Sequence, residues 1–599
     1  MLIGADSGGT FTDVVGTDGR ILKIPSTPAD PGAAVRDGVA GLTGGGSRPE
    51  LLAHGTTVAT NAVLEGRLAR VALVTTEGFA DVVEIGRQQR PSLYDPWHDR
   101  PEPLVGREDR LEVHERLDAA GAVLVPLGPE LPRPADGVEA VAVCLLHADL
   151  EPAHEREVAA RLRALGWDVS ASHEVSPEFR EFERTVTTVL NAALRPVCGP
   201  YLAGLAGEAG EVAVMTSAGG LVGLDAAAAS PASLLLSGPA AGARAAAAVA
   251  AACGFPDAVS FDMGGTSTDV CLVLDGAPAE VAQHEVAGRP VRLPSVDVHT
   301  VGAGGGSIAH LDAGGALVVG PASAGAVPGP ACYGRGGTLP TVTDADLVAG
   351  RLPAGVGLSG IGALDHGAAI TALAAAGVDA EGVIRVVEAG MEQAVRRVSV
   401  ERGVDPAGLA LVAFGGAGPL HACGLADSLG MAAVIVPAAA GVLSAVGLLT
   451  SPRRRELVRS RARPGDPSGL DDDLAALAAE AVALLPGATV RTFVDARYAG
   501  QSHELTVIDP SGFAAEHRAR NGYDRPGHPV EVTAVRAVAT LPAPAAIEEV
   551  LAAWAGRWPE PVVGPVALVR DDCTIWVPQG WVGSEGALGS LVLRRRAEA

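Results

Sequence analysis

A nine-residue motif that occurs twice constrains the fold of this 599-residue chain more than any other feature. The first copy is Asp6-Ser-Gly-Gly-Thr-Phe-Thr-Asp13-Val14 and the second is Asp262-Met-Gly-Gly-Thr-Ser-Thr-Asp269-Val270, with seven of nine residues identical at an offset of 256. Each copy lies between two apolar runs, and each second run ends at an Asp-Gly pair typical of a hairpin turn. Two strand–turn–strand units this far apart predict two related lobes rather than a short-period solenoid.

The residue types of the repeat suit a phosphate site. Paired glycines let the backbone approach a ligand closely, and N–H groups with threonine hydroxyls can form a donor nest for phosphate oxygens. An aspartate at the strand end suits Mg²⁺ held mostly through water. We therefore predict that phosphates bind through Gly8, Gly9, Thr10, Thr12, Gly264, Gly265 and Thr266.

Four aspartates recur with the motif. Asp6 and Asp262 are the predicted catalytic carboxylates, and the same two residues are the predicted Mg²⁺ ligands. Asp13 and Asp269 are equally suited to a ligand role and to a structural role that orients the turn. A pair of tight hairpins in a repeated scaffold would not need both carboxylates to recur.

A third glycine cluster runs from Phe414 to His421, after a strand-like segment. It precedes a helical pattern from His421 to Leu429 that ends at Gly430. A helix N-terminus after a glycine turn favours phosphate, although an ordinary tight turn has the same composition. Because this cluster follows the two hairpins in order, we predict that its glycines line an adenosine pocket: Gly415, Gly416 and Gly418.

Other motifs are weaker candidates for substrate contacts. His54 and Thr56 belong to a His-Gly-Thr-Thr turn that either reaches a substrate or is a hydrogen-bonded turn. Asp297 and His299 lead into a glycine-rich loop around Gly304, whose composition suggests close approach to a ligand. The arginines Arg87 and Arg90 could bind an anionic substrate, and they suit structural ion pairs equally well.

The charge balance excludes some partners. The chain has 45 basic and 70 acidic residues and a net charge of −25, which argues against nucleic acids and anionic membrane surfaces as partners. Lys23 is the only lysine, an imbalance that resembles the codon bias of a GC-rich genome and carries no functional prediction. The apolar stretch 432–449 is interrupted by proline and glycine, so we expect a buried strand, loop and helix there.

The cysteines indicate the compartment. Seven scattered cysteines with no C-x-x-C spacing predict reduced, mostly buried thiols in a cytoplasmic protein. The first residues show no basic and apolar regions of a signal peptide. The cysteines and histidines show no metal-ligand spacing, so we predict no structural zinc.

Together these motifs resemble a known family. Asp-x-Gly-Gly-Thr twice, followed by Gly-Gly-x-Gly, is the order of the phosphate-1, phosphate-2 and adenosine loops in the actin, Hsp70 and sugar-kinase superfamily. Longer segments are similar to the hydantoinase A family, which includes N-methylhydantoinase A subunits, the N-terminal half of 5-oxoprolinase and the corresponding subunit of acetone carboxylases. Such segments are HGTTVATNAVLEG (54–66), SGPAAGA (237–243), HTVGAGGGSIA (299–309) and FGGAGPLHACGLADSLG (414–430).

The resemblance covers essentially the whole chain, with two departures in the tail. The segment between about 540 and 564 is shorter than usual, and His503 replaces a tyrosine common in the family. The resemblance implies an α/β fold of duplicated ribonuclease H-like (actin/Hsp70/sugar-kinase) lobes around an ATP cleft, with a small β-rich C-terminal domain. We place the first lobe at 1–190, the second at 191–452 and the C-terminal domain at 453–599.

Two helices are predicted near these boundaries. Ser176 and Pro177 suit the N-cap and first position of the helix that closes the first lobe. A second helix is predicted near 468–485, at the start of the C-terminal domain.

The resemblance also implies a reaction. In the family, ATP and Mg²⁺ serve to phosphorylate an amide, lactam or ketone oxygen, which prepares the carbonyl carbon for hydrolysis or carboxylation. The leading hypothesis is an ATP-dependent amidohydrolase subunit of the hydantoinase, 5-oxoprolinase or lactamase type that acts on a cyclic amide. Because the chain stops near residue 599, we expect a separate hydantoinase B-type subunit and a hetero-oligomer.

Two alternatives stay open. The first is the ATP-binding subunit of an acetone carboxylase-type enzyme with a ketone substrate, which the sequence does not separate from the leading hypothesis. The second is a non-catalytic, actin-like nucleotide-gated protein. The intact pair Asp6 and Asp262 argues against the second alternative, because loss of phosphoryl chemistry would remove the need for both carboxylates.

Overall fold

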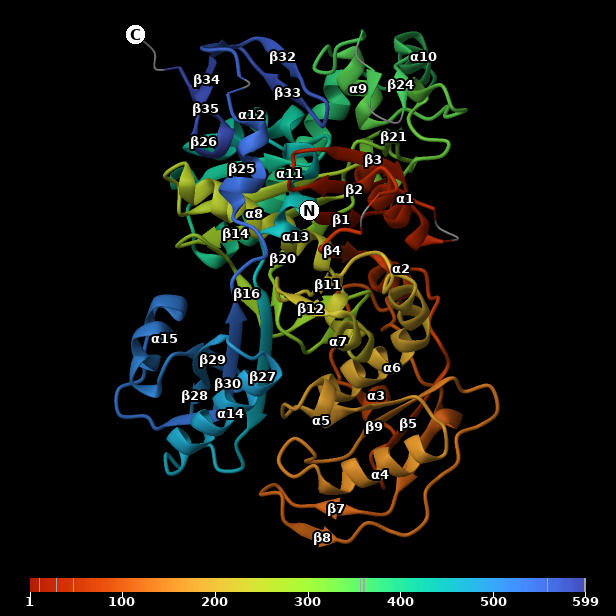
Figure 1. Ribbon diagram of the computed structural model, residues 1–599, viewed down its shortest axis with the longest axis vertical. Coiled ribbons are helices and arrows are strands. Elements are labelled where there is room, and N and C mark those ends of the chain that lie inside the picture. The colour runs from red at the N-terminus through yellow and green to blue at the C-terminus, as the bar shows by residue number, and fades with distance from the viewer. Residues whose placement is uncertain are drawn as a thin grey trace.

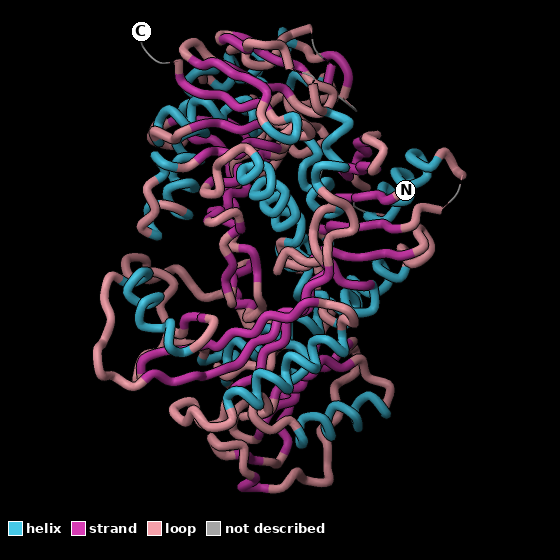
Figure 2. Tube along the Cα trace, turned by 60° about the vertical axis from the view of Figure 1, so that its left-hand side comes forward, coloured by secondary structure: helices cyan, strands magenta, loops and turns pink. Residues whose placement is uncertain are grey.

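The computed structural model describes residues 1–9, 11–27, 30–46, 48–355, 357–358, 361–556 and 558–596. Within these residues the strands form two large mixed sheets, a smaller parallel sheet and several two-stranded ribbons. In Figure 1, β14, β25 and β26 of the second large sheet are at the upper left, β1 to β3 of the first are to their right, and the smaller sheet is at the lower right. Figure 2 shows helices on both sides of the strands.

The first large sheet has ten described strands in the order β29-β28-β30-β27-β12-β11-β4-β1-β2-β3. Their bounds are β1 (Leu2–Ser7), β2 (Phe11–Gly16), β3 (Ile21–Pro25), β4 (Leu51–Thr56), β11 (Glu211–Met215), β12 (Leu221–Gly223), β27 (Arg453–Ser460), β28 (Thr489–Tyr498), β29 (Leu505–Val507) and β30 (Val530–Leu541).

The second large sheet has the described order β15-β14-β13-β25-β26-β35-β34-β31, and β20 pairs with β14 beside this path. Its strands are β13 (Ala258–Met263), β14 (Thr268–Leu274), β15 (Ala277–Pro278), β20 (Val298–Val301), β25 (Ala410–Phe414), β26 (Ala433–Val436), β31 (Val562–Val563), β34 (Trp581–Glu585) and β35 (Leu591–Arg595).

The two sheets share one topology at their centres. In the first sheet β1 pairs antiparallel with β2, β2 with β3, and β1 and β11 each lie parallel to β4. In the second sheet β13 pairs antiparallel with β14, β14 with β15, and β13 and β26 each lie parallel to β25. The register repeats as well, since Asp6 lies opposite Asp13 and Asp262 opposite Asp269. The duplicated α/β lobes predicted from the repeat are therefore confirmed.

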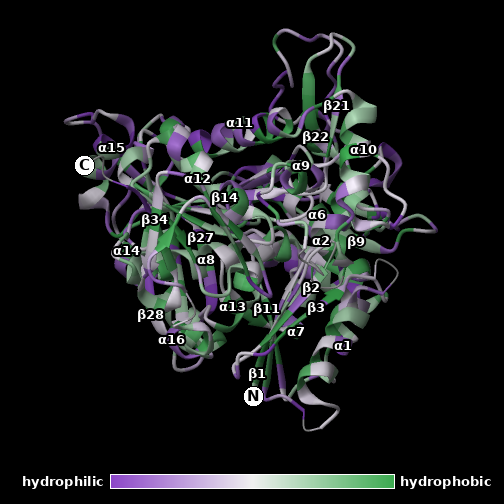
Figure 3. Ribbon diagram, turned by 90° about the horizontal axis from the view of Figure 1, so that it is seen from above, coloured by the Kyte–Doolittle hydropathy of each residue, from purple (hydrophilic) through white to green (hydrophobic). Residues whose placement is uncertain are grey.

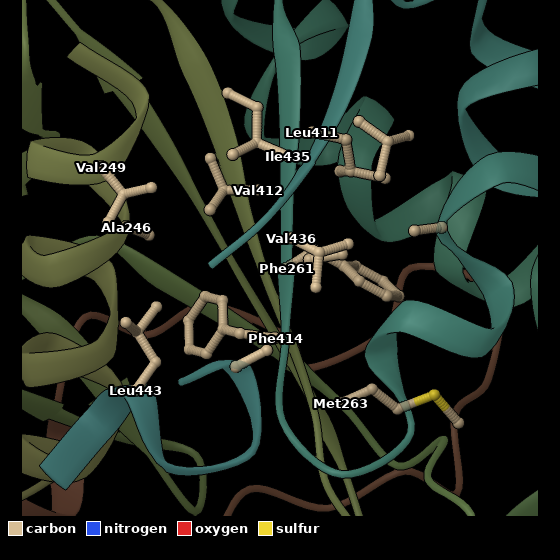
Figure 4. Packing of buried hydrophobic residues seen from close by; sticks show 14 of the residues in the cluster. Ala246, Val249, Phe261, Met263, Leu411, Val412, Phe414, Ile435, Val436 and Leu443 are labelled. Atoms are coloured by element: carbon tan, nitrogen blue, oxygen red, sulfur yellow. The ribbon is translucent and has the colours of Figure 1, made fainter. Parts of the chain in front are cut away.

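Helices fill the space beside the second sheet. These are α8 (Ser237–Ala252), α11 (Ala380–Val398), α12 (Gly418–Leu429) and α13 (Leu443–Leu449). Because side chains alternate along a strand, Val412 and Phe414 point toward α8 and Leu411 points to the opposite face, as Figure 4 shows. Figure 3 shows hydrophobic residues along the inner elements and many hydrophilic residues on α11, in keeping with one buried face of that helix.

The remaining helices cover the first sheet and the smaller units. They are α1 (Pro31–Thr43), α2 (Val58–Leu64), α3 (Val82–Ile85), α4 (Ala153–Ala164), α5 (Ser172–Val175), α6 (Glu181–Ala203), α7 (Leu224–Ala229), α9 (Val342–Val348), α10 (His366–Ala376), α14 (Leu470–Leu484), α15 (Phe513–Asn521) and α16 (Ile547–Leu551). Among them, α14 agrees with the helix predicted near 468–485, and α12 ends at Gly430 as expected.

A separate parallel sheet lies within the first lobe. Its strands are β6 (Arg110–Val113), β5 (Val71–Thr76), β9 (Ala140–Cys144) and β10 (Val169–Ala171), in that spatial order. They form their own small cores with α4 and α6. The sequence analysis did not predict this sheet, because its strands are short and pair with segments far apart in the chain.

The helix predicted to begin at Pro177 begins at Glu181, so that prediction was wrong by one turn. The Ser176 hydroxyl does not cap the helix; it donates to the carbonyl of Arg292 instead. This helix, α6, also runs to Ala203 and passes the lobe boundary placed at 190.

Residues 453–599 do not lie beside one sheet alone. Strands β27 to β30 extend the first large sheet, and β31, β34 and β35 extend the second. The blue part of the chain accordingly occupies two places in Figure 1. The division into three domains stays a prediction.

Several local predictions are confirmed. Asp275 and Gly276 form the turn between β14 and β15 with positive φ at both residues. The apolar stretch 432–449 contains β26, a 3-10 turn and α13, whose residues are buried apart from the half-buried Ser444. All seven cysteines are free thiols, and six of them are buried. No helix in the described part of the chain is long and apolar enough to span a membrane.

Candidate active site

The two repeated hairpins meet between the lobes. The charge of Asp269 in the second hairpin raises the pKa of Asp6 in the first, after the larger effects of burial and of Asp13. Conversely, Asp6 and Asp13 both raise the pKa of Asp262, after burial and Asp269. Coulombic effects between buried groups fall with separation, so these mutual effects indicate that the two hairpins lie near one another. The fold therefore gathers four carboxylates from two distant segments at one place.

Asp6 sits in a tight cradle of backbone. Gly55 lies directly opposite it on the parallel strand β4, and a Cβ on Gly55 would be 2.6 Å from Asp6 Oδ1. Gly238, in the first turn of α8, leaves similar room, with a Cβ position 3.3 Å from the same oxygen. Asp6 thus faces the N-terminus of a 16-residue helix, where the macrodipole favours negative charge.

Asp262 occupies the equivalent cradle in the second lobe. Gly415 has φ +79°, and a Cβ there would be 2.4 Å from Asp262 Oδ1. The hydroxyl of Ser444, in the first turn of α13, donates to Asp262 Oδ2 at 3.3 Å. Gly415 therefore belongs to the site for a reason that the sequence analysis did not foresee, namely close packing against the second carboxylate.

All four carboxyls hold protons more tightly than ordinary aspartates. Burial, reinforced by the neighbouring carboxylates, raises the pKa of Asp6 to about 7 and that of Asp262 to about 8. Burial raises the pKa of Asp269 to about 6, and burial also raises the pKa of Asp13. A cluster of acids whose charged forms are disfavoured is prepared to accept a cation or a proton.

Two side chains that the sequence analysis did not single out complete the cluster. Lys23 on β3 donates to Asp13 Oδ1 at 2.6 Å and to the carbonyl of Gly441 at 2.9 Å. Thr300 on β20 lies opposite Asp269 and donates its hydroxyl to Asp269 Oδ1 at 2.5 Å. The only available signal for Lys23 was its status as the sole lysine.

The glycine turns of the two hairpins close alike. The N–H of Gly8 donates to the carbonyl of Phe11, and the N–H of Gly264 donates to the carbonyl of Ser267, each at 3.0 Å. Gly9, Gly265 and Thr266 are exposed at the turns. Their exposure leaves room for a ligand beside each turn.

The predicted threonines differ in their surroundings. Thr12 is buried, and its hydroxyl lies 3.2 Å from that of Ser7 and 3.3 Å from that of Ser26. Ser26 in turn donates to the carbonyl of Gly8, so this chain of hydroxyls supports the first turn from beneath. Thr10 lies outside the described residues.

The predicted adenosine loop lies directly beside Asp262. Gly415 packs on that carboxylate, Gly416 is exposed with no atom within 4 Å of its Cβ position, and Gly418 begins α12. The loop is held by the N–H of Ala417, which donates to the carbonyl of Met263 in the second hairpin. A contact with adenosine stays a prediction, for which Gly416 is the most open position of the three.

Beneath that loop, α12 is fixed by a buried charge cluster. His421 lies 3.3 Å from Asp346 and 3.2 Å from Glu388. Although burial opposes charge, the two carboxylates raise the pKa of His421 to about 9. His421 is therefore a charged structural anchor for the helix that starts at the glycine loop.

The glycine-rich loop around Gly304 supports the glycine turn of the second hairpin. Gly305 and Gly306 donate their N–H groups to the carbonyls of Gly264 and Gly265 at 3.0 and 2.7 Å. A Cβ on Gly304 would lie 2.6 Å from the nitrogen of Thr266. The two loops are stacked backbone to backbone, which explains why this segment is so rich in glycine.

Asp297 and His299 lie away from this stack. Asp297 forms an ion pair with Arg402. His299 is adjacent to Thr300 on β20, so its side chain leaves the opposite face of the strand from the one that meets Asp269. Burial and Arg397 lower the pKa of His299. The structure does not bring these two residues to the carboxylate cluster, and a substrate contact for either stays a prediction.

His54 and Thr56 converge on a tyrosine beneath Asp6. The Nδ1 atom of His54 lies 2.9 Å from the carbonyl of Ala5, so it carries the proton, and Nε2 accepts from the hydroxyl of Tyr201 at 2.6 Å. The hydroxyl of Thr56 donates to that of Tyr201 at 3.3 Å. Burial lowers the pKa of His54 to about 4, so its ring is neutral. These contacts lie within the protein, and the substrate role remains a prediction.

The two candidate arginines have different surroundings. Arg87 makes two hydrogen bonds to Glu183 of α6, which is a structural ion pair. Arg90 lines an open hollow of about 500 Å³ together with Gln88 and His98. This hollow lies on the loop after α3.

The carboxylate cluster fits Mg²⁺ held in the predicted way. No group of three or more His, Cys, Asp or Glu side chains among the described residues is arranged as a resident metal site. Asp6 and Asp262 instead offer hard oxygen ligands whose pKa values are raised first by burial and then by the neighbouring carboxylates, so a cation at this place would stabilise their charged forms. Mg²⁺ typically takes one or two carboxylates and fills its shell with water and phosphate oxygens, which matches this donor set.

The fold and this site define a class of protein. Residues 2–166 match the hydantoinase/oxoprolinase N-terminal region, and residues 184–456 match the hydantoinase/oxoprolinase family. The chain belongs to the hydantoinase/oxoprolinase family.

Three individual proteins of known name are similar to this chain over most of its length. Caprolactamase subunit alpha of Pseudomonas jessenii is 35% identical over 598 residues, which cover 88% of this chain and 85% of the relative. The acetophenone carboxylase gamma subunit of Aromatoleum aromaticum is 35% identical over 73% of this chain and 66% of its own length. The 5-oxoprolinase 1 of Arabidopsis thaliana is 34% identical over 74% of this chain, but only 40% of that longer protein is covered.

A solved structure confirms the fold. The crystal structure of ATP-dependent caprolactamase from Pseudomonas jessenii superimposes with a TM-score of 0.82 at 30% identity, covering 99% of this chain and 100% of the other. The family resemblance noted from the sequence is thus confirmed over nearly the whole chain.

Proposed function

We propose that this chain is the ATP-binding subunit of an ATP-dependent hydrolase that acts on a cyclic amide. The observation that carries the proposal is the convergence of Asp6 and Asp262 from two hairpins of identical register. The similarity to a caprolactamase subunit over most of both chains supports the substrate class. ATP with Mg²⁺ would bind between the hairpins, with phosphates at Gly8, Gly9, Gly264 and Gly265 and adenosine at Gly416.

The proposed reaction has two stages. The carbonyl oxygen of the cyclic amide attacks the γ-phosphorus of ATP, the bond from that phosphorus to the bridging oxygen breaks, and ADP leaves. Addition of one water to the activated carbon opens the ring carbon–nitrogen bond and leaves an acyl phosphate. A second water then hydrolyses the acyl phosphate, which gives an amino acid and phosphate. Phosphoryl transfer depends mainly on the alignment of the reactants and on stabilisation of charge, and it needs no covalent bond between the protein and the phosphoryl group.

The residues of this chain supply those two effects. Gly55 packs directly against the carboxylate of Asp6 and Gly415 against that of Asp262, so the backbone limits movement of either carboxylate away from a bound ion. Mg²⁺ would be held by Asp6 and Asp262 and would neutralise phosphate charge. Asp13 and Asp269 lie opposite Asp6 and Asp262 in their hairpins, a position that suits a ligand role and a role in orienting the turn equally well.

A partner subunit is part of the proposal. Two of the relatives are named as subunits, which supports a multi-subunit enzyme. We propose a hydantoinase B-type chain as the partner, and a hetero-oligomer as the working form. A cytoplasmic location is proposed from the seven free thiols.

A second candidate function is carboxylation of a ketone. It is favoured by the similarity to an acetophenone carboxylase subunit. The phosphorylation stage would be the same with an enolised ketone oxygen, and bicarbonate-derived carbon would replace water in the second stage. The carboxylate cluster does not distinguish the two reactions, because both begin with transfer of the γ-phosphoryl group.

The proposal is tested by ADP release from the purified chain with Mg²⁺, alone and with a co-expressed B-type partner. The panel contains caprolactam, 5-oxoproline, hydantoins, and acetone or acetophenone with bicarbonate, and Asp262→Asn serves as the inactive control. We expect one cyclic amide to stimulate ADP release selectively. Stimulation by a ketone alone would select the carboxylase, and ATP binding without stimulation by any compound in the assembled enzyme would favour a non-catalytic nucleotide-gated protein.

A further inference from the structure

Lys23 stands apart chemically and geometrically from the other basic residues. It is the only lysine among 45 basic residues. Its ammonium group, largely buried, lies between the two lobes, where it donates to Asp13 Oδ1 and to the carbonyl of Gly441. Gly441 belongs to the 3-10 turn Ala440–Val442 that leads into α13. The chain thus uses its one lysine where the first hairpin meets the second lobe.

The geometry explains why an ammonium group suits this position. An ammonium carries three N–H donors around a compact centre, whereas a guanidinium is planar and longer. Two of the three donors are used, by a carboxylate 2.6 Å away and a carbonyl 2.9 Å away. Among the described residues these are the two acceptors of the Lys23 ammonium group, which leaves its third donor for a further acceptor beside the carboxylates.

The charge of the surroundings indicates what that acceptor is. The positive charge of Lys23 lowers the pKa of Asp6 and of Asp13 against the effect of burial. In the described part of the chain, Asp6, Asp262 and Asp269 have no ion pair of their own. A nucleotide would add several phosphate charges to four carboxylates, so positive charge beyond that of Mg²⁺ is needed at this point.

We propose that Lys23 binds a phosphate of the nucleotide with its third donor while its other two donors hold Asp13 to Gly441. This assignment rests on the proposed function, since it names a further binding residue of the same site. Lys23 then contributes in two ways. It offsets phosphate charge directly, and it ties the first phosphate hairpin to the turn that positions the second.

The contacts around Gly441 show how the tie reaches Asp262. The carbonyl of Ala440 accepts from the N–H of Gly415, which packs on Asp262. One helical turn later, Ser444 donates to Asp262 itself. On its other side, the N–H of Gly441 donates to Asp572 Oδ2 at 2.8 Å. Lys23 is therefore connected, through the turn Ala440–Val442, to both supports of the second carboxylate.

The sole lysine makes a direct labelling experiment possible. An acyl-phosphate ester of ATP is used as the probe on the full-length chain with Mg²⁺. If Lys23 contacts the phosphates, its amine attacks the acyl carbon, the bond from that carbon to the phosphate oxygen breaks, ATP leaves, and an amide forms with loss of one proton. We expect one acylated lysine peptide in the mass spectrum, and its suppression by excess ATP.

A matched control separates proximity from simple reactivity. Arg463 is exposed on the turn between β27 and α14. The variant R463K carries a second lysine, which a simple amine-reactive ester should label and the ATP probe should not. Equal labelling of both lysines by the ATP probe, without protection by ATP, would overturn the assignment.

Binding measurements give an independent test. Loss of a charge-assisted hydrogen bond predicts about 10- to 100-fold weaker ATP binding by calorimetry for K23M. K23R keeps the charge but not the geometry, so we expect it to restore less than half of the lost binding free energy. Melting temperatures near that of the unchanged chain establish that both variants fold. Unchanged ATP affinity in K23M would overturn the assignment.

The outcomes also separate this inference from the proposed function. If the unchanged chain binds ATP and releases ADP but Lys23 is neither labelled nor needed for affinity, the inference about Lys23 fails and the function stands. If the unchanged chain binds no ATP at all, the nucleotide site itself is wrong, and both fail together.

Discussion

The two repeated hairpins have the same backbone pairing and different electrostatic surroundings. Asp6 faces Asp13 in the first hairpin as Asp262 faces Asp269 in the second. In the first hairpin Asp13 pairs with the ammonium group of Lys23, whereas the side-chain donors to Asp262 and Asp269 in the described part of the chain are hydroxyl groups, those of Ser444 and Thr300. The pKa of Asp262 accordingly rises to about 8, above the value of about 7 for Asp6.

This difference shows what duplication preserved and what diverged. Strand register fixes where each carboxylate lies, and both lobes retain it. The neighbouring side chains come from segments outside the repeat, and they give each lobe its own charge. The comparison therefore assigns the more cation-deficient position to Asp262, on the second lobe.

The largest expected effect comes from neutralising either carboxylate. Asp6→Asn and Asp262→Asn should each lower substrate-stimulated ADP release by about 1,000-fold or more, since both remove a charge at the phosphoryl group. Asp275→Asn is the matched control, because it lies at the far end of β14 in a positive-φ turn that asparagine tolerates. A residual rate within tenfold for either site variant would remove that hairpin from the reaction.

A pair of glycine variants separates support of the second hairpin from contact with ligand. Gly304→Ala should destabilise the protein by about 1–3 kcal/mol, since its Cβ would lie 2.6 Å from the Thr266 nitrogen. Gly416→Ala meets no atom within 4 Å, so its melting temperature should not change while ATP binding weakens. Thermal unfolding and calorimetry check both. Normal ATP affinity in Gly416→Ala would exclude that glycine from the adenosine pocket.

Removing a hydroxyl tests the neutral support of the second hairpin. Thr300→Val deletes the donor to Asp269, so ADP release at pH 7 should fall about 5- to 20-fold. The pKa of Asp269 should rise further, which would move the acid limb of the pH–rate profile to higher pH. Thr300→Ser should restore both the rate and the profile. A uniform loss of rate with no movement of the profile would mean that Thr300 acts only through packing.

The smallest expected effect is on pH dependence. The folded-state pKa of Asp262 exceeds its reference value of 3.8, so its contribution to stability is complete below about pH 4 and is lost as pH rises through 8. Without ligand, the melting temperature should therefore decline between pH 6 and pH 8.5, and Asp262→Asn should decline less. Mg²⁺ competes with these protons, so its affinity should rise with pH by no more than about tenfold per unit for each proton displaced. If the melting temperatures of the unchanged chain and of Asp262→Asn fall equally with pH, Asp262 does not cause the decline in stability.

The parts of the structure that could be predicted are those that depend on patterns of neighbouring residues in the sequence. The repeat led to both hairpins, and glycine with helical periodicity led to the adenosine-loop helix and its end at Gly430. Ser176 misled the prediction of a helix start, because its hydroxyl has a distant partner, the carbonyl of Arg292, that no local pattern reveals. The parallel sheet of β5, β6, β9 and β10 was missed for the same reason, since its pairing joins segments far apart in the chain.

The residues of the candidate site also fall into those that the sequence predicted and those that it did not. Asp6 and Asp262 were identified because they recur in a motif. Lys23, Thr300 and Ser444 were not, because each reaches the site from an element without a motif of its own. Lys23 did carry a signal as the sole lysine, but composition was interpreted as codon usage alone.

The placement of the final strands has a consequence for biosynthesis. The first sheet needs β27 to β30 at its edge, and the second needs β31, β34 and β35, which follow them in the chain. Neither lobe can complete its sheet while the chain is still being translated through these segments. Both large sheets can therefore be completed only after the C-terminal strands have emerged from the ribosome. Truncation within β35 (Leu591–Arg595) would leave β26 with an unpaired edge.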